Sequence, residues 1–140
     1  MTEIYFVVPG KVVPKQSTRF YRGHCVPQKK VEDYAKHVKA CFYEEYPIQR
    51  MVWEDKDTPL EIIINVYFEV PKSESKKKRE AKLLFGFPTK IPDLDNCTKS
   101  VMDACKKVIF PDDAQIVSQT ARKFWASEPS VEVTIREAKR

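Results

Sequence analysis

The sequence predicts a single domain of the α/β or α+β class, in which a mixed β-sheet packs against two amphipathic helices. Two stretches, 61–70 and 131–136, alternate apolar and polar residues as strands do. Two others, about 29–45 and 94–108, repeat apolar residues every three or four positions as helices do. The 140 residues contain no internal repeat and no dividing linker, and their number supports one hydrophobic core. We therefore expect residues 1–140 to form one compact domain.

The first half of the chain contains a strand, a basic segment and a helix. Ile4–Val8 is an almost continuous apolar run, which predicts a strand covered on both faces. Lys11–Gln28 is rich in Pro, Ser, Arg and aromatic residues and contains Gly23, which predicts an irregular hairpin or a mobile loop. A helix is expected from about Lys29 to Glu45, because its apolar residues keep helical spacing: Val31, Tyr34, Ala35, Val38, Cys41 and Phe42.

The second half begins with the clearest strand, residues 61–70. Ser73 or Ser75 is placed to cap a short basic helix that follows it. The two closing strands are expected at about Gln115–Phe124 and Val131–Arg136. Between the basic helix and these strands lies the second amphipathic helix, with its apolar residues again at helical spacing: Leu94, Cys97, Val101, Ala104, Cys105 and Val108.

Composition excludes several common classes of protein. Three scattered glycines, Gly10, Gly23 and Gly86, cannot form a Walker A loop or a dinucleotide fingerprint, so no nucleotide cofactor is expected. His24 and His37 do not have the i, i+4 spacing of a zinc-binding helix. The four cysteines contain no CxxC, which indicates free, buried thiols in a reducing compartment. No apolar stretch approaches the ~18 residues of a membrane span and the N-terminus lacks a basic region, so we expect a cytoplasmic protein without a membrane partner.

The net charge of +5 conceals an uneven distribution. Residues 11–39 contain eight basic and two acidic residues, a local charge of +6. Residues 72–90 contain seven basic and two acidic residues, a local charge of +5. Between them, residues 41–70 contain two basic and seven acidic residues, a local charge of −5. Two basic segments around an acidic one suit a polyanionic partner such as nucleic acid, although ordinary solvated helix faces and loops would have the same composition.

Acidic residues occur at the start of the second amphipathic helix and again just after its end. Asp93 and Asp95 open the helix, and Asp112 and Asp113 precede the next strand. The simplest interpretation is structural, because a carboxylate at a helix start caps free N–H groups and interacts favourably with the helix dipole. The alternative is a site for a hard cation such as Mg²⁺, which prefers carboxylate and water oxygens.

Lys99 lies four residues after Asp95, one helical turn along the same face. A pair at this spacing ordinarily stabilises a helix by about 0.2–0.5 kcal/mol. The functional interpretation is a cation beside a metal ion, placed to neutralise a phosphate that gains charge during reaction. Asp103 is two turns, ~12 Å, from Asp95 and too far to share its metal ion, so we assign it to support of Lys99 or to structure.

Together these residues resemble the RusA-type Holliday junction resolvases, small crossover-junction endonucleases common in phage and prophage genomes. The resemblance covers nearly the whole chain, beginning with an N-terminal strand and a basic stretch, here residues 10–20. The family's Pro-Asp-x-Asp-Asn-x-x-Lys helix is similar to residues 92–99, and Asp103-Ala104 matches its helical Asp-Ala. Residues 112–117 resemble the family's Asp-Asp-Ser-Gln-Val element, and Arg122-Lys123 and a closing strand follow.

The resemblance implies a RusA-like fold and a structure-selective endodeoxyribonuclease that resolves four-way DNA junctions by paired symmetric nicks in recombination and repair. It implies that Asp93, Asp95 and Asp113 bind Mg²⁺, with Mn²⁺ as the other candidate metal. Lys99 would join these acids in catalysis, and Asn96 and Asp112 would assist in the site. Two symmetric cuts suit a C₂ homodimer with branched DNA as its partner, in the cytoplasm of a bacterium and encoded by a phage or prophage.

One departure from the family pattern affects the end of the second amphipathic helix. Lys106-Lys107 stands where the family has Asn-Gly, so the left-handed glycine cap is missing. We therefore expect this helix to run further or to end less sharply. Which of Asp112 and Asp113 is the metal ligand stays open for the same reason.

Two other classes of function remain open from the sequence. One is a non-catalytic DNA-binding module whose acids merely cap a helix. The other is a metal-dependent nuclease or phosphoesterase that acts on flaps, RNA or smaller phosphates. If the protein binds DNA, we expect the N-terminal basic segment to contribute more to binding than the second basic segment, whose consecutive charges cannot all face one duplex. The expected contacts in the N-terminal segment are Lys11, Lys15, Arg19 and Arg22, and those in the second segment are Lys76 and Lys77.

Overall fold

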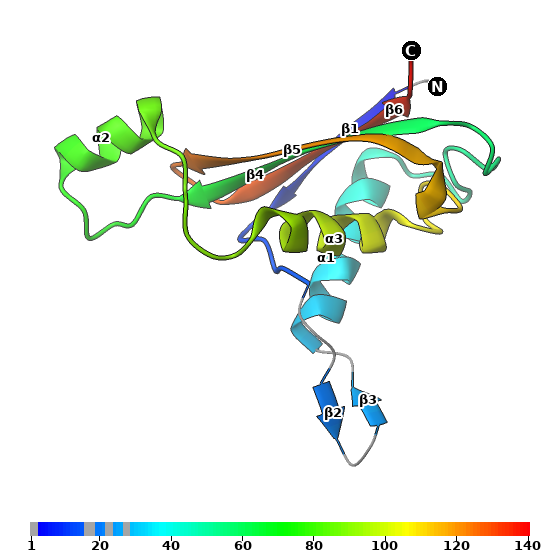
Figure 1. The fold of residues 1–140 in the computed structure, drawn as a ribbon, viewed down its shortest axis with the longest axis horizontal. Helices are drawn as coiled ribbons and strands as arrows, with labels where there is room; N and C mark the ends of the chain where they lie inside the picture. Colours follow the sequence, from blue (N-terminus) through cyan, green and yellow to red (C-terminus); the bar gives the residue numbers. More distant parts are fainter. Residues whose placement is uncertain (1–2, 16–18, 22–23, 27–28) are drawn as a thin grey trace.

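Four strands form one mixed β-sheet in the order β1–β6–β4–β5 (Figure 1). The computed structural model describes residues 3–15, 19–21, 24–26 and 29–140. β6 (Ser130–Glu137) pairs antiparallel with both β1 (Glu3–Pro9) and β4 (Leu60–Glu69). β4 pairs in parallel with the edge strand β5 (Ile116–Ala126). A parallel pair needs a long crossover, and this one contains two helices.

Two helices cover one face of the sheet, and a third stands apart (Figure 1). α1 (Lys29–Glu45) and α3 (Leu94–Cys105) contact each other beneath the sheet. α2 (Lys76–Phe85) lies beyond the end of the sheet, and none of its ten residues, all of them described, is fully buried. In the described part of the chain, no helix is long and apolar enough to cross a membrane. The core lies between the sheet and the α1–α3 layer, and its largest side chains include Phe42, Phe110, Ile4, Leu60, Ile62 and Ile64.

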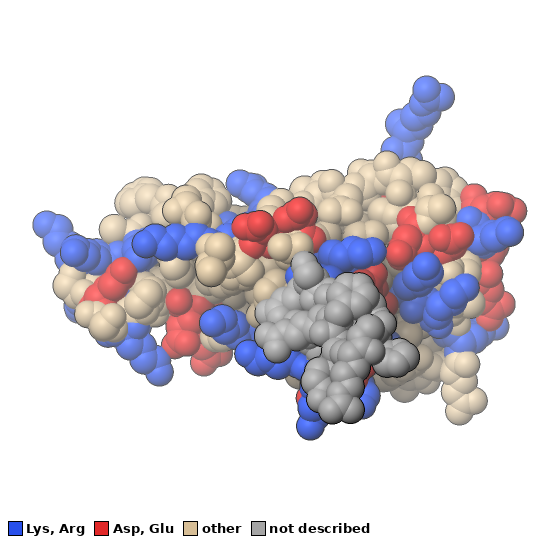
Figure 2. Space-filling model, turned by 60° about the horizontal axis from the view of Figure 1, so that its bottom comes forward, with Lys and Arg blue, Asp and Glu red and all other residues tan. Residues whose placement is uncertain are grey.

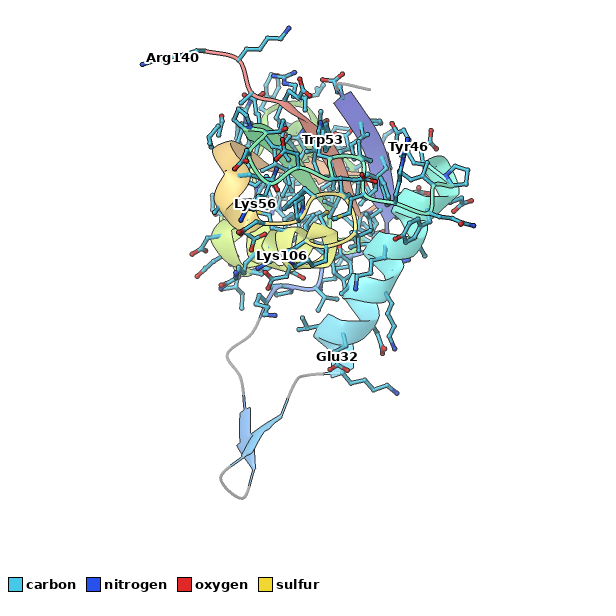
Figure 3. All side chains as sticks on the ribbon, turned by 90° about the vertical axis from the view of Figure 1, so that its right-hand side faces the viewer. Glu32, Tyr46, Trp53, Lys56, Lys106 and Arg140 are labelled. Atoms are coloured by element: carbon cyan, nitrogen blue, oxygen red, sulfur yellow. The ribbon has the colours of Figure 1, made fainter. Side chains whose placement is uncertain are left out.

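The basic segment after β1 contains a small hairpin, as one of the two sequence alternatives predicts. β2 (Arg19–Tyr21) and β3 (His24–Val26) pair antiparallel and project from the helical side of the domain (Figures 1 and 3). Arg22 lies outside the described residues, as does the side chain of Arg19.

The expected helices and strands of the body are all present, with small shifts at their ends. α1 has the predicted bounds, and Ser75, one of two expected caps, accepts a hydrogen bond from the N–H of Lys78 at 3.3 Å. One prediction is wrong, because β1 is not covered on both faces. Its residues alternate between buried and exposed, with Tyr5 at 45% and Val7 at 41% exposure. In the parts of the chain that the structure describes, helices lie on one face of this sheet, so the other face of β1 meets solvent (Figure 1).

α3 ends sharply although glycine is absent from its C-terminus, which corrects the expectation of a longer or less defined end. The helix stops at Cys105, and Lys107 adopts the left-handed conformation, with φ of 67°, that glycine usually provides. The N–H of Lys107 donates to the carbonyl of Phe110 at 2.7 Å, and the N–H of Ile109 donates to Cys105 at 2.9 Å. A tight turn therefore leads from α3 to Asp112 and the start of β5.

Lys107→Gly should stabilise the protein, because glycine adopts this backbone conformation without the steric cost of a β-carbon. The greater freedom of glycine in the unfolded chain offsets part of the gain, so we expect the free energy of unfolding to rise by about 0.5–1 kcal/mol. Urea denaturation measures this change. Lys106→Gly is the control, because Lys106 has an ordinary φ of −60° and glycine there should destabilise. A Lys107→Gly protein no more stable than wild type would show that the turn carries no strain.

Candidate active site

The start of α3 presents two exposed carboxylates. Asp93 is the residue that precedes the first turn, and Asp95 lies within that turn. Within the described part of the chain, the side chain of Asp93 makes no capping hydrogen bond, so the capping interpretation does not hold for it. Oδ1 of Asp95 accepts a hydrogen bond from the N–H of Asn96 at 3.1 Å. The pair is therefore available to a ligand from solution.

The thiol of Cys97 lies behind this acidic pair and is fully buried. The pKa of Cys97 is raised to about 11, mainly by burial. Lys123 lowers this pKa, and Asp93 and Asp95 raise it. These three charged groups therefore gather around the first turn of α3. Cys97 is protonated at neutral pH. Both it and Cys105 are buried free thiols, as the sequence predicts, whereas the free thiol of Cys41 is only partly buried and the side chain of Cys25 lies outside the described residues.

Asp103 joins two lysines on the exposed face of α3. Its Oδ1 lies 3.1 Å from Nζ of Lys99, and its Oδ2 lies 3.1 Å from Nζ of Lys15. The pair with Asp103 replaces the pair with Asp95 that the spacing indicates, and this contact is compatible with one of the two roles expected for Asp103, support of Lys99. The side chain of Lys99 is still 58% exposed, so its ammonium can reach a phosphate in solution.

Asp112 has a structural role at the turn before β5. Its Oδ1 accepts a hydrogen bond from the N–H of Ala114 at 3.0 Å, and its own N–H donates to Oε1 of Gln115 at 3.1 Å. These two bonds form a capping box on a short 3₁₀ turn, Asp113–Gln115. The carboxylate of Asp112 is therefore engaged with the backbone of its own turn.

Asp113 differs from its neighbour. Its Oδ1 is buried and has no hydrogen-bond partner among the described residues, and its Oδ2 lies 3.9 Å from Nζ of Lys106. An unpaired buried carboxylate oxygen is costly unless something binds it. Of the two acids at this turn, Asp113 is thus the better candidate ligand.

α3 separates Asp113 from the Asp93–Asp95 pair. Burial and, to a smaller extent, Asp113 raise the pKa of Cys105, in the last turn, to about 12, whereas Asp93 and Asp95 act on Cys97 in the first turn. Asp95 and Cys105 are ten residues apart along α3, which corresponds to about 15 Å. Figure 1 shows α3 running to the turn before β5, and Figure 3, viewed from that end, shows Lys106 there.

One protomer therefore brings Asp93 and Asp95 together but leaves Asp113 at the other end of the helix. Accordingly, the described residues contain no group of three or more His, Cys, Asp or Glu side chains that could hold a metal ion. The donor chemistry nevertheless fits Mg²⁺, because Asp93 and Asp95 offer exposed carboxylate oxygens and Oδ1 of Asp113 has no hydrogen-bond partner within the described residues. For all three acids to bind one Mg²⁺ ion, the carboxylate of Asp113 must come close to those of Asp93 and Asp95.

The predicted DNA-binding residues lie in two places. Lys11 and Lys15 are exposed on the segment after β1, and the N–H of Lys15 donates to the carbonyl of Asn96 at 2.9 Å, which ties this segment to α3. Lys76 and Lys77 are exposed on α2, at the far end of the sheet. Figure 2 shows Lys and Arg side chains on both sides of the segment drawn in grey, with acidic side chains among them. This face is mixed in charge rather than uniformly basic.

A hollow of about 510 Å³ lies between the N-terminal basic segment and the approach to Asp93. Its lining includes Lys11 and Lys30 together with the apolar residues Ile91 and Pro92. Two ammonium groups beside apolar side chains suit a nucleotide, whose phosphate is anionic and whose base has apolar faces. Two of the lining residues, Ile91 and Pro92, directly precede Asp93 in the chain.

Comparison with known proteins identifies the family. The model of the family described as endodeoxyribonuclease RusA matches residues 9–136, nearly the whole chain. The chain belongs to the RusA family. One relative, the uncharacterised protein YqaN of Bacillus subtilis (strain 168), is 44% identical over 82 residues, which cover 56% of this chain. The aligned part spans 58% of the length of YqaN.

Two residues of this RusA-family chain organise the site although the sequence alone assigns them no role. Gln115 is buried, and its Nε2 donates to the carbonyls of Asp55 at 3.1 Å and Thr58 at 3.0 Å, which anchors the turn that carries Asp113. Lys123 binds the segment before Asp93. Strand alternation could have drawn attention to Lys123, because a lysine on the helix-facing side of a strand needs an explanation.

Proposed function

We propose that this chain is a Mg²⁺-dependent endodeoxyribonuclease that resolves four-way DNA junctions by paired nicks. The observation that supports the proposal most strongly is the exposed pair Asp93 and Asp95 at the start of α3, where the side chain of Asp93 makes no capping hydrogen bond within the described part of the chain. The exposed ammonium of Lys99 follows one helical turn later. Family membership supports endodeoxyribonuclease activity, and the two carboxylates suit a hard cation. A purely structural pair at a helix start would be expected to cap the helix, and Asp93 does not.

The chain's own residues would divide the work of binding and charge compensation. Asp93 and Asp95 would hold the cation; Mg²⁺, when bound, supplies an activated water and compensates charge on the leaving oxygen. Lys99 would bind the scissile phosphate, and Asp103 directs its ammonium. Asn96 supports Asp95 through its N–H. The products would carry 5′-phosphate and 3′-hydroxyl ends.

A homodimer would complete the site. The pair and Asp113 lie at opposite ends of α3, so a shared cation requires Asp113 of the partner subunit to approach the pair. Such an arrangement also places two equivalent sites about a two-fold axis, as paired symmetric cuts require. We therefore propose that each cation is held by Asp93 and Asp95 of one protomer and by Asp113 of the partner subunit.

Mixing two inactive variants tests this arrangement. Asp95→Asn and Asp113→Asn homodimers should each be inactive. Half of the dimers formed by random exchange of equal amounts are mixed, and each mixed dimer has one intact site between protomers, so nicking should return to about one quarter of wild type. Co-purification of differently tagged subunits measures the fraction of mixed dimers and so shows that exchange has occurred. No recovery in a mixture proven to exchange would place all three acids in one protomer.

Substrate comparison tests the proposed selectivity. Equal concentrations of four-way junction, flap, linear duplex and RNA hairpin should give fastest cleavage of the junction, with cuts placed symmetrically on opposing strands. Preferred cleavage of flaps or RNA would favour the general nuclease. Tight junction binding without cleavage in Mg²⁺ or Mn²⁺ would favour the non-catalytic module.

Replacing Lys15 and Arg19 together should weaken junction binding and its salt dependence. Each lost phosphate contact reduces the slope of log affinity against log salt concentration by about 0.9, so the slope should fall by close to about 2 per subunit. Replacing Lys77 and Lys78 on the outlying α2 should change it less. Titrations across a range of NaCl concentrations measure both slopes. Equal slopes for wild type and the Lys15/Arg19 variant would exclude this segment from the DNA interface.

A further inference from the structure

We propose that Lys123 is a positioning residue for the metal-binding acids, a role that rests on the proposed function. Lys123 faces the helices, because it pairs in register with Val66, which is fully buried. Its Nζ donates to the carbonyl of Lys90 at 2.7 Å and to that of Pro92 at 2.9 Å. These carbonyls belong to the segment that leads directly into Asp93.

The hydrogen bonds of Lys123 fix the backbone on one side of Asp93. An ammonium has three N–H donors, and two of them bind the carbonyls of this irregular segment, while Nζ lies 5.3 Å from the centre of the Phe68 ring. On the other side of Asp93, its own carbonyl accepts the N–H of Cys97 at 3.2 Å. Asp93 is therefore held from both directions, by the sheet through Lys123 and by the first bond of α3.

The charge of Lys123 lies close to the same acids, because its ammonium binds the carbonyl of Pro92, the residue before Asp93. A fixed positive charge at this place offsets the mutual repulsion of two carboxylates before a cation arrives. Because two of its three donors are committed to backbone carbonyls, we assign Lys123 to the acids rather than to the DNA.

Lys123→Met tests the proposal, since methionine keeps the apolar stem beside Phe68 but removes the charge and the donors. Mg²⁺ binding to the DNA-free protein, measured by titration calorimetry, should weaken about tenfold, the usual effect of losing a residue that orients a metal ligand. The Mg²⁺ concentration for half-maximal junction nicking should rise by a similar factor. Lys123→Arg should restore most of the affinity, because a guanidinium also donates to carbonyls. The salt dependence of junction binding should not change.

Arg122→Met is the matched control. It removes the same charge from the neighbouring residue of β5, but Arg122 lies over the rings of Phe87 and Phe124 and makes no contact with the carbonyls bound by Lys123. Its Mg²⁺ affinity should equal that of wild type.

Three results would overturn the proposal or the function beneath it. A folded Lys123→Met protein with wild-type Mg²⁺ affinity would overturn the positioning role. A fall of about 0.9 in its salt slope would make Lys123 a phosphate contact instead. Wild-type protein that neither binds Mg²⁺ nor nicks junctions would overturn the proposed function itself. If Lys123→Met does not fold, Lys123→Gln is titrated in the same way with the same expectation.

Discussion

Asp95→Asn should lower junction cleavage by about 1,000-fold or more while the protein stays folded. Asparagine keeps the size of the side chain but loses the charge that would hold the cation. Junction affinity should stay equal or rise, because a negative charge facing the phosphates disappears. Single-turnover cleavage and gel-shift titration on the same junction measure the two quantities. We expect the same result for Asp93→Asn and Asp113→Asn.

Asp112→Asn is the control for these variants, because it removes the charge of a neighbouring acid that is not proposed to bind the cation. Asparagine caps a helical turn about as well as aspartate, so the capping box before β5 should survive and cleavage should stay near wild type. A large loss of cleavage in Asp112→Asn, with Asp113→Asn active, would exchange the roles of the two acids. A folded Asp95→Asn protein with near wild-type cleavage would remove Asp95 from the site.

Lys99→Ala should reduce cleavage by about 100–1,000-fold, since it removes a charge-stabilising group from the phosphate. Its effect on stability should be small, because an exposed pair at i, i+4 contributes about 0.3–0.5 kcal/mol. Cleavage per folded molecule and urea denaturation of the same preparation separate the two effects.

Lys72→Ala provides the matched comparison for Lys99→Ala. Lys72 forms an exposed pair with Glu69 at 3.8 Å, three residues away and far from α3 in sequence. The stability change should resemble that of Lys99→Ala, and cleavage should be unaffected. A large stability loss in Lys99→Ala with unchanged cleavage would make its pair with Asp103 purely structural.

Periodicity predicted the body of this fold well, because one layer of helices packed on a sheet has simple burial patterns. The alternation of 61–70 and 131–136 and the helical spacing of 29–45 correspond closely to β4, β6 and α1. The same reasoning failed for β1, since a run of apolar residues does not show that Tyr5 and Val7 lie on a face without helices. The prediction that α3 would end less sharply without a glycine was also wrong, because backbone hydrogen bonds hold Lys107 in the left-handed conformation.

The site was only partly accessible to sequence reasoning. Motif spacing predicted the acids and Lys99 as site residues. Spacing cannot show that the carboxylate of Asp112 forms a capping box, or that an oxygen of Asp113 has no hydrogen-bond partner among the described residues. The spacing of the motifs also does not show that Asp113 and Asp95 lie at opposite ends of α3. The contact of Lys123 with the segment before Asp93 joins residues about thirty positions apart, and it depends on the register of β5 against β4.

Nicking of an immobile four-way junction tests the central claim most directly. Purified protein is incubated with end-labelled junction in Mg²⁺, in EDTA and in EDTA followed by excess Mg²⁺, with the Asp95→Asn protein in parallel. We predict paired symmetric nicks in Mg²⁺, none in EDTA, recovery when Mg²⁺ is restored and none with Asp95→Asn. Cleavage that persists in EDTA, or that Asp95→Asn retains, would contradict a metal-dependent site at the start of α3.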